Sequence, residues 1–346
     1  MAKLNIAIMC GPDNGSPRVL AETLEQFILK LGHNPKVYYR VKAFKRLLSY
    51  KQANYNPFLW LFYKLKNYSG DRKLFSELKN KDAIIICDWT PNGFYRQTYN
   101  IEKLRGIVNH KPILYYAVQF LENSPTIIEK LKAGNHALRE RYDWHLTVSA
   151  VTELRGKPSP PWNQIGMYLK STGLKPVVKK EFMVIVDFLR PGYEEYRATQ
   201  IKVLQELGIK YISLEKEYSL EEIRELYKQS ALIFIQFPEA YGLPIAECLS
   251  CGSYIGTPHS SWPMSWRLDD KLEVHGPGTL PDCFLVYDGE EDLKNKLTVM
   301  RDNYDLKATP EKVFGTFIRF YPTFYEGNAE SLSEVLKRIE DKDLAC

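Results

Sequence analysis

The chain has 346 residues, of which 45% are hydrophobic and 26% are charged, and its formal net charge is +5. This length predicts two domains, because single hydrophobic cores stop growing at about 250–300 residues, and the composition excludes a mainly disordered chain. No apolar run approaches the ~20 residues that a membrane-spanning helix needs, and the first residues lack a signal-peptide pattern. We therefore expect a cytoplasmic protein, either free or bound peripherally to the inner face of a membrane.

The first half of the chain predicts an α/β domain. Residues 4–9 form a short apolar run that ends in a glycine loop containing Gly11 and Gly15, and residues 19–31 have helical spacing. Further apolar runs predict strands at residues 37–39, 83–87, 112–116 and 144–148. Continuous apolar strands that alternate with helices indicate a parallel sheet covered on both faces.

The second half repeats this alternation after a proline-rich stretch, which we interpret as a linker at residues 161–180. Strands are expected at residues 182–188, 210–214, 232–236 and 254–256, with helices at residues 194–207, 220–229 and 245–251. The predicted fold is therefore α/β, with two Rossmann-like, doubly wound parallel-sheet domains at residues 1–160 and 181–322, followed by a C-terminal helical segment at 323–346. Two such sheets in tandem indicate a cleft between the domains, since ligands bind at the carboxyl ends of parallel strands.

Residues 231–258 are the most informative segment. A buried strand leads to a loop that carries Glu239, and Glu247 follows after seven intervening residues, one turn into the next helix. Gly242 permits close backbone approach to a ligand, and Pro244 suits a first helical turn. The N–H groups of residues 242–245 are expected to face a diphosphate, and the carboxylates to accept hydrogen bonds from hydroxyl groups. The alternative interpretation is an ordinary helix with acidic residues near its start.

This pattern resembles the donor-site motif of retaining glycosyltransferases of the GT-B fold, in particular glycosyltransferase family 4, the group 1 glycosyltransferases. The resemblance implies a nucleoside diphosphate sugar as donor, bound by the C-terminal domain, and an acceptor bound mainly by the N-terminal domain. It implies that Glu239 contacts the transferred sugar and acts in catalysis, and that Glu247 holds the ribose hydroxyls. It also places the backbone of Tyr241-Gly242-Leu243-Pro244 and the loop with Gly11 and Gly15 beside the donor.

The chain departs from the family pattern at two places. Gln119 stands where many family members have a histidine, and we keep it as a candidate catalytic residue. The cationic pair that neutralises the diphosphate in the family is displaced here, which makes Arg190 and Arg197 the candidates for that role. Each arginine has an alternative interpretation as a surface charge near a helix start.

The sequence predicts neither a metal nor a cofactor besides the donor substrate. No Asp-x-Asp stands at a strand end, and helix N-termini with Arg or Lys can stabilise a leaving diphosphate without a metal. Cys248 and Cys251 form a C-x-x-C, but no second pair stands at the spacing of zinc ligands, so we interpret them as small packing residues.

A basic and aromatic segment at residues 36–81 accounts for the positive net charge. It contains twelve Lys or Arg residues and two acidic ones, together with Phe58, Trp60, Phe62 and Tyr63. Such a mixture suits an anionic membrane surface or a lipid-linked acceptor, and it also suits nucleic acid. A solvated basic face above an aromatic core is the structural alternative.

The function predicted from these residues is transfer of a sugar to a lipid-linked, polysaccharide or other acceptor. Two other classes remain open. A nucleotide-sugar 2-epimerase uses a similar cleft without an acceptor. A non-catalytic subunit would keep the donor site while the chemistry is lost, an alternative that Gln119 raises.

Overall fold

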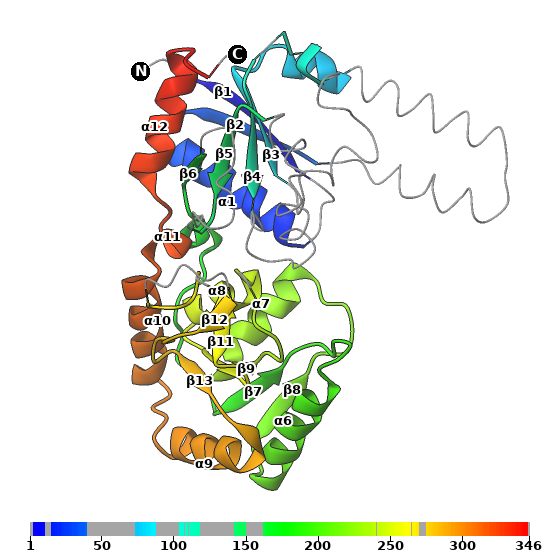
Figure 1. Cartoon of the computed structure of the whole chain (residues 1–346), viewed down its shortest axis with the longest axis vertical. Helices are drawn as coiled ribbons and strands as arrows, with labels where there is room; N and C mark the ends of the chain where they lie inside the picture. The colour runs from blue at the N-terminus through cyan, green and yellow to red at the C-terminus, as the bar shows by residue number, and fades with distance from the viewer. Residues whose placement is uncertain are drawn as a thin grey trace, which may run out of the picture.

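The computed structural model describes residues 3–10, 15–39, 73–87, 104–106, 108–109, 111–117, 142–149, 162–239, 241–263, 265–269 and 275–344. These residues form two α/β domains stacked along the long axis of the molecule (Figure 1). Gly11, Gln119 and most of the basic segment lie outside the described residues.

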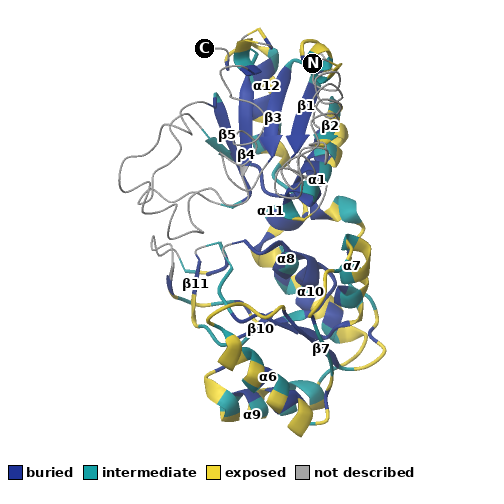
Figure 2. Cartoon of the chain, turned by 90° about the vertical axis from the view of Figure 1, so that its right-hand side faces the viewer, coloured by how far each residue is buried: buried dark blue, intermediate teal, exposed yellow. Residues whose placement is uncertain are grey.

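The N-terminal domain is built on a parallel sheet of six strands in the order β2-β1-β3-β4-β5-β6. The strands are β1 (Asn5–Cys10), β2 (Asn34–Tyr39), β3 (Ala83–Cys87), β4 (Ile113–Ala117), β5 (Trp144–Thr147) and β6 (Trp162–Gln164). Successive residues of β1 belong to different cores, because Ile6 and Ile8 pack beneath α1 (Ser16–Lys30) while Ala7 and Met9 pack on the opposite face. Both faces of the central strands are therefore buried, as Figure 2 shows in dark blue.

The C-terminal domain has a second parallel sheet, in the order β13-β10-β9-β7-β8. Its strands are β7 (Met183–Val186), β8 (Lys210–Ser213), β9 (Leu232–Phe234), β10 (Tyr254–Thr257) and β13 (Phe284–Val286). Helices α6 (Glu194–Glu206) and α9 (Gly289–Asp302) cover one face. Helices α7 (Leu220–Gln229), α8 (Leu243–Ser250) and α10 (Ala308–Phe320) cover the other.

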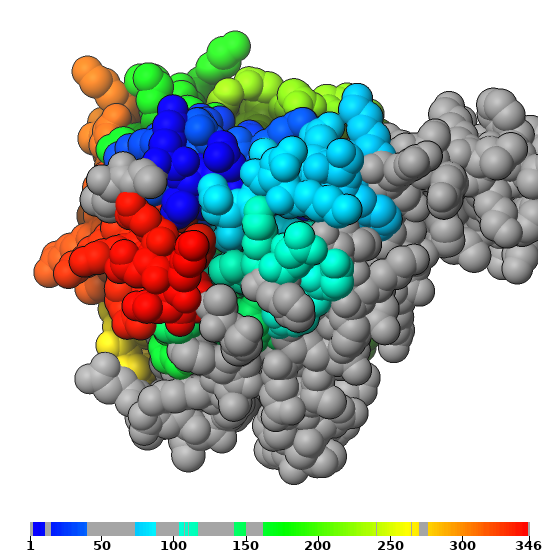
Figure 3. All heavy atoms as spheres, turned by 90° about the horizontal axis from the view of Figure 1, so that it is seen from above, coloured from blue at the N-terminus to red at the C-terminus, as the bar shows by residue number. Residues whose placement is uncertain are grey.

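Two chain segments connect the domains side by side. The first runs through η2 (Leu169–Thr172), and the second returns through α11 (Pro322–Tyr325) to α12 (Ala329–Glu340), which packs against β6 of the N-terminal sheet. The Met167 N–H donates to the Thr323 carbonyl at 2.8 Å, and a Cβ added to Gly166 would lie 2.1 Å from the same oxygen. This close approach requires glycine at position 166. Seen from above, α12 lies in red beside the blue N-terminal segment (Figure 3).

The structure confirms the predicted α/β fold and the expected strands and helices among the described residues. Four of the observed α-helices and β-strands were not expected. Strand β6 forms within the segment assigned to the linker, where it lies at the sheet edge and pairs on one side only. The others are helix α10 and an antiparallel pair, β11 (Ser261–Pro263) with β12 (His275–Pro277). None of the helices in the described ranges combines the length and the hydrophobicity of a membrane-spanning segment.

Candidate functional site

Arg190 and Glu239 meet at the carboxyl edge of the C-terminal sheet. Arg190 follows β7 and Glu239 follows the neighbouring strand β9, so the parallel sheet brings both to the same edge. Arg190 Nη2 lies 3.3 Å from Glu239 Oε1, and its guanidinium stacks 3.9 Å above the ring of Phe237. The arginine side chain remains 44% exposed and the glutamate side chain 27% exposed, so a ligand can reach both.

A second carboxyl group, that of Asp187, lies beside this pair. Burial raises the pKa of the Glu239 carboxyl, the Arg190 guanidinium opposes that rise, and the charge of Asp187 adds to it. Burial also raises the pKa of Asp187, which lies 3.9 Å from Arg190. Arg190 therefore stands between two carboxylates, and a ligand that carries negative charge would compete with them for this one cation.

Helix α8 begins directly after the Glu239 loop. Its N-cap, Gly242, has φ 57° and ψ 85°, and a Cβ there would lie 2.7 Å from Ile245 Cδ1 and 2.9 Å from Glu239 Cβ, so the position requires glycine. The expectation that the N–H groups of residues 242–245 all face a ligand was wrong. Pro244 has no N–H, and the Ile245 N–H donates to the Gly242 carbonyl at 2.9 Å. The N–H groups of Gly242 and Leu243 precede the first intrahelical bonds of α8.

Tyr241 points away from this edge. Its side chain is buried, stacks with Trp266, and meets Phe324 of α11 edge-on at 4.9 Å between ring centroids. Its hydroxyl donates to Met167 Sδ at 3.5 Å, in the first connecting segment. The side chain thus joins the loop that carries Glu239 to both interdomain connections.

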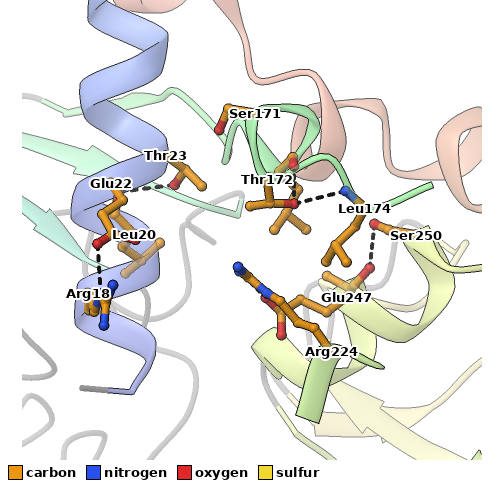
Figure 4. A network of polar contacts seen from close by, with 12 residues as sticks. Arg18, Leu20, Glu22, Thr23, Ser171, Thr172, Leu174, Arg224, Glu247 and Ser250 are labelled. Atoms are coloured by element: carbon orange, nitrogen blue, oxygen red, sulfur yellow. Dashed lines mark hydrogen bonds and ion pairs between the residues drawn. The ribbon is translucent and has the colours of Figure 1, made fainter. Parts of the chain in front are cut away.

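Glu247 lies in α8, but a partner from the neighbouring helix already holds its carboxylate. Arg224 of α7 donates to Glu247 Oε1 through Nε at 2.9 Å and through Nη2 at 2.6 Å (Figure 4). The Glu247 side chain is only 3% exposed. Burial raises the pKa of the carboxyl, and the positive charge of Arg224 opposes the rise. The sequence analysis missed Arg224, which no local signal marks, because it meets Glu247 only when the two helices pack together.

Arg197 uses its hydrogen-bond donors for contacts within the protein. Its Nε donates to the Asp187 carbonyl at 3.1 Å, and its Nη2 donates to the Ser213 hydroxyl at the end of β8. The side chain is only 12% exposed. Its hydrogen bonds tie the ends of β7 and β8 together.

Gly15 lies in the other domain, where it directly precedes α1 and has φ 75°.

His259 is a further polar residue that the sequence analysis did not select. It follows β10, and its Nε2 lies 2.7 Å from the carbonyl of Gln236, at the start of the Glu239 loop. The imidazole meets the rings of Tyr193 and Tyr196 edge-on. The hydrogen bond links the loops that follow two adjacent strands.

Among the described residues, no group of three or more His, Cys, Asp or Glu side chains is placed to hold a metal ion. Cys248 and Cys251 are both buried in the core that includes α8, and burial raises the pKa of the Cys251 thiol to about 12. A buried thiol with a raised pKa is a poor nucleophile and a poor metal ligand.

Comparisons with known proteins define the fold. No family model matches the chain, and its sequence matches no curated protein. The structure is similar to the catalytic domain of starch synthase IV from Arabidopsis thaliana bound to ADP and acarbose, with a TM-score of 0.55 and 12% identity over 100% of both chains. It is also similar to Phytolacca americana UGT2 complexed with UDP-2-fluoro-glucose and pterostilbene, with a TM-score of 0.50 and 11% identity over 97% of this chain and 100% of that chain. The chain therefore has the GT-B fold of two Rossmann-like domains.

Proposed function

We propose that this chain is a glycosyltransferase that moves a sugar from a nucleoside diphosphate sugar to an acceptor held on the N-terminal side of the cleft. The observation that carries the proposal is the pairing of Arg190 with Glu239 at the start of α8, on the carboxyl edge of a parallel sheet. A cation, a helix start and a carboxylate meet there, which suits a ligand that carries both a diphosphate and a sugar. The ADP and the UDP sugar named for the two similar structures support this donor class.

The chemistry assigns a separate task to each group. Arg190 and the N–H groups of Gly242 and Leu243 stabilise the charge that develops on the leaving diphosphate, so the proposal needs no metal. Glu239 accepts hydrogen bonds from the sugar hydroxyls after Arg190 turns toward the phosphates. Glu247 offers its second oxygen to the ribose, since Arg224 occupies the first. The family resemblance favours a retaining reaction.

The direct test is incubation of the purified chain with a panel of radiolabelled nucleoside diphosphate sugars. We expect slow hydrolysis of one donor, which rises when the right acceptor is added. Conversion of the donor to its 2-epimer would identify an epimerase instead. Binding without any turnover would identify a non-catalytic subunit.

A single arginine variant tests the site. Arg190→Ala should weaken binding of the nucleoside diphosphate by about 10-fold or more, because charge-assisted hydrogen bonds contribute about 1.5–3 kcal/mol each. The matched control is Arg319→Ala, which removes an exposed arginine from the last turn of α10. Equal affinities of the two variants, measured by calorimetry, would contradict the placement of the diphosphate.

A further inference from the structure

A polar pocket of about 360 Å³ lies between the domains, and none of its lining residues comes from the loop at 236–242. Helix α1 and the end of β2 line one side, while η2 and Arg224 of α7 line the other. Figure 4 shows Glu22 of α1 and Arg224 on opposite sides of this space, with Ser171 and Thr172 beside it. Its volume falls in the range of about 300–1,000 Å³ that is typical of small-molecule sites.

The charges around this pocket are largely paired with one another. Arg18 Nε donates to Glu22 Oε1 at 2.8 Å, and Arg224 forms an ion pair with Glu247. Glu25 Oε1 accepts the Val37 N–H at 3.1 Å. Each arginine already has its carboxylate and Glu25 is held by a backbone N–H, so the pocket carries a small excess of negative charge, which disfavours an anionic ligand.

The hydrogen-bonding capacity that remains is divided between the two sides. On α1, Glu22 Oε1 is taken by Arg18 and by the Tyr39 hydroxyl, whereas Glu22 Oε2 and the exposed amide of Gln26 have no partner in the described part of the chain. Opposite, Arg224 uses Nε and Nη2 for Glu247, and its Nη1 has no partner among the same residues. One side therefore offers a carboxylate acceptor and an amide that can donate or accept, and the other offers a guanidinium donor.

We propose that this pocket binds a neutral polyhydroxylated molecule, a mono- or disaccharide, at a site distinct from the donor site. A hydroxyl group both donates and accepts, so neighbouring hydroxyls of one sugar ring can donate to Glu22 and accept from Arg224 at the same time. The bound saccharide joins the two domains through these contacts. Only the coupling of this site to Glu247, through their shared partner Arg224, depends on the proposed function.

The experiment titrates the intact chain with glucose, galactose, mannose, maltose, cellobiose and lactose, with binding followed by saturation-transfer NMR and calorimetry. We expect at least one of these sugars to bind, and the anionic glucuronic acid to bind more weakly than glucose. Gln26→Leu should weaken binding about 3- to 10-fold, as expected for one lost hydrogen bond to a neutral group. Gln229→Leu, the same change at an exposed glutamine of α7 outside the pocket, should have no effect.

Each sample is also titrated with ADP and UDP, and its thermal unfolding midpoint is recorded. Saccharide binding that persists with saturating nucleotide and is lost selectively in Gln26→Leu supports the inference. Displacement of the saccharide by nucleotide would overturn it, since the pocket would then be part of the donor site. Absence of saccharide binding in a chain that still binds nucleotide would overturn the inference alone, and absence of both would overturn the proposed function as well.

Discussion

Lys179 is a buried lysine that holds together the ends of the two helices that carry Arg224 and Glu247. It is 3% exposed, and its Nζ donates to the carbonyls of Lys228 in α7 at 2.8 Å and Cys251 after α8 at 2.9 Å. Carbonyls at helix C-termini attract a cation. Burial nevertheless lowers the pKa of the ammonium from 10.5 to about 8. The folded chain thus releases this proton more easily than the unfolded chain.

This lowered pKa determines the sign and the size of the effect of pH on the stability of the folded chain. Between pH 8 and 10.5 the unfolded chain binds more protons at Lys179, so this residue makes the folded state more stable as the pH rises. The change in the Lys179 pKa from 10.5 to about 8 corresponds to a loss of about 3 kcal/mol in the free energy of unfolding at low pH. About 2.5 kcal/mol of this free energy is regained between pH 7 and pH 10.

The assay is urea unfolding of the wild-type chain and Lys179→Met at pH 7, 8, 9 and 10, followed by tryptophan fluorescence. Other lysines and tyrosines titrate in both proteins, so the difference between the two unfolding free energies isolates Lys179. We expect that difference to change by about 2.5 kcal/mol in favour of the wild type as the pH rises to 10. A difference that stays constant over this range would refute the reasoning.

Three other predictions concern the site and the basic segment. Glu247→Ala should lower the free energy of unfolding by about 3 kcal/mol, because it leaves Arg224 with no carboxylate. The double variant Glu247→Leu with Arg224→Met should regain most of this loss. Equal unfolding curves for the single variant and the wild type would contradict the prediction. Glu239→Gln should spare nucleoside diphosphate binding and reduce turnover, and wild-type turnover would exclude the assigned role. If the basic segment docks on anionic membranes, liposome binding at fixed ionic strength should weaken by about 1 kcal/mol per neutralised charge, whereas tighter binding to oligonucleotides would favour nucleic acid. The charges to neutralise are Lys42, Lys45, Arg46 and Lys51.

The fold and the start of helix α8 could be predicted from the sequence because their signals are local. Apolar runs such as residues 83–87 are continuous, as expected for strands buried on both faces, and they become β3 and its neighbours. The order of Glu239, Gly242 and Pro244 along the chain specifies a loop, an N-cap and a first helical turn without reference to the rest of the molecule. The sequence therefore predicts local backbone conformation and which strands are buried on both faces.

Only the tertiary structure decided which side chains are available at the site. Arg224 and Glu247 are 23 positions apart and meet because α7 packs on α8. Tyr241 is adjacent to Gly242 in sequence, yet its ring packs in the core against Phe324. The Arg197 guanidinium is hydrogen-bonded to the ends of β7 and β8. Contacts between separate helices and strands produce no recognisable spacing of residues in the sequence, because they depend on how whole elements pack together. The sequence could therefore predict the loop that carries Glu239, whereas only the packing determined that Tyr241 is buried while Glu239 remains partly exposed.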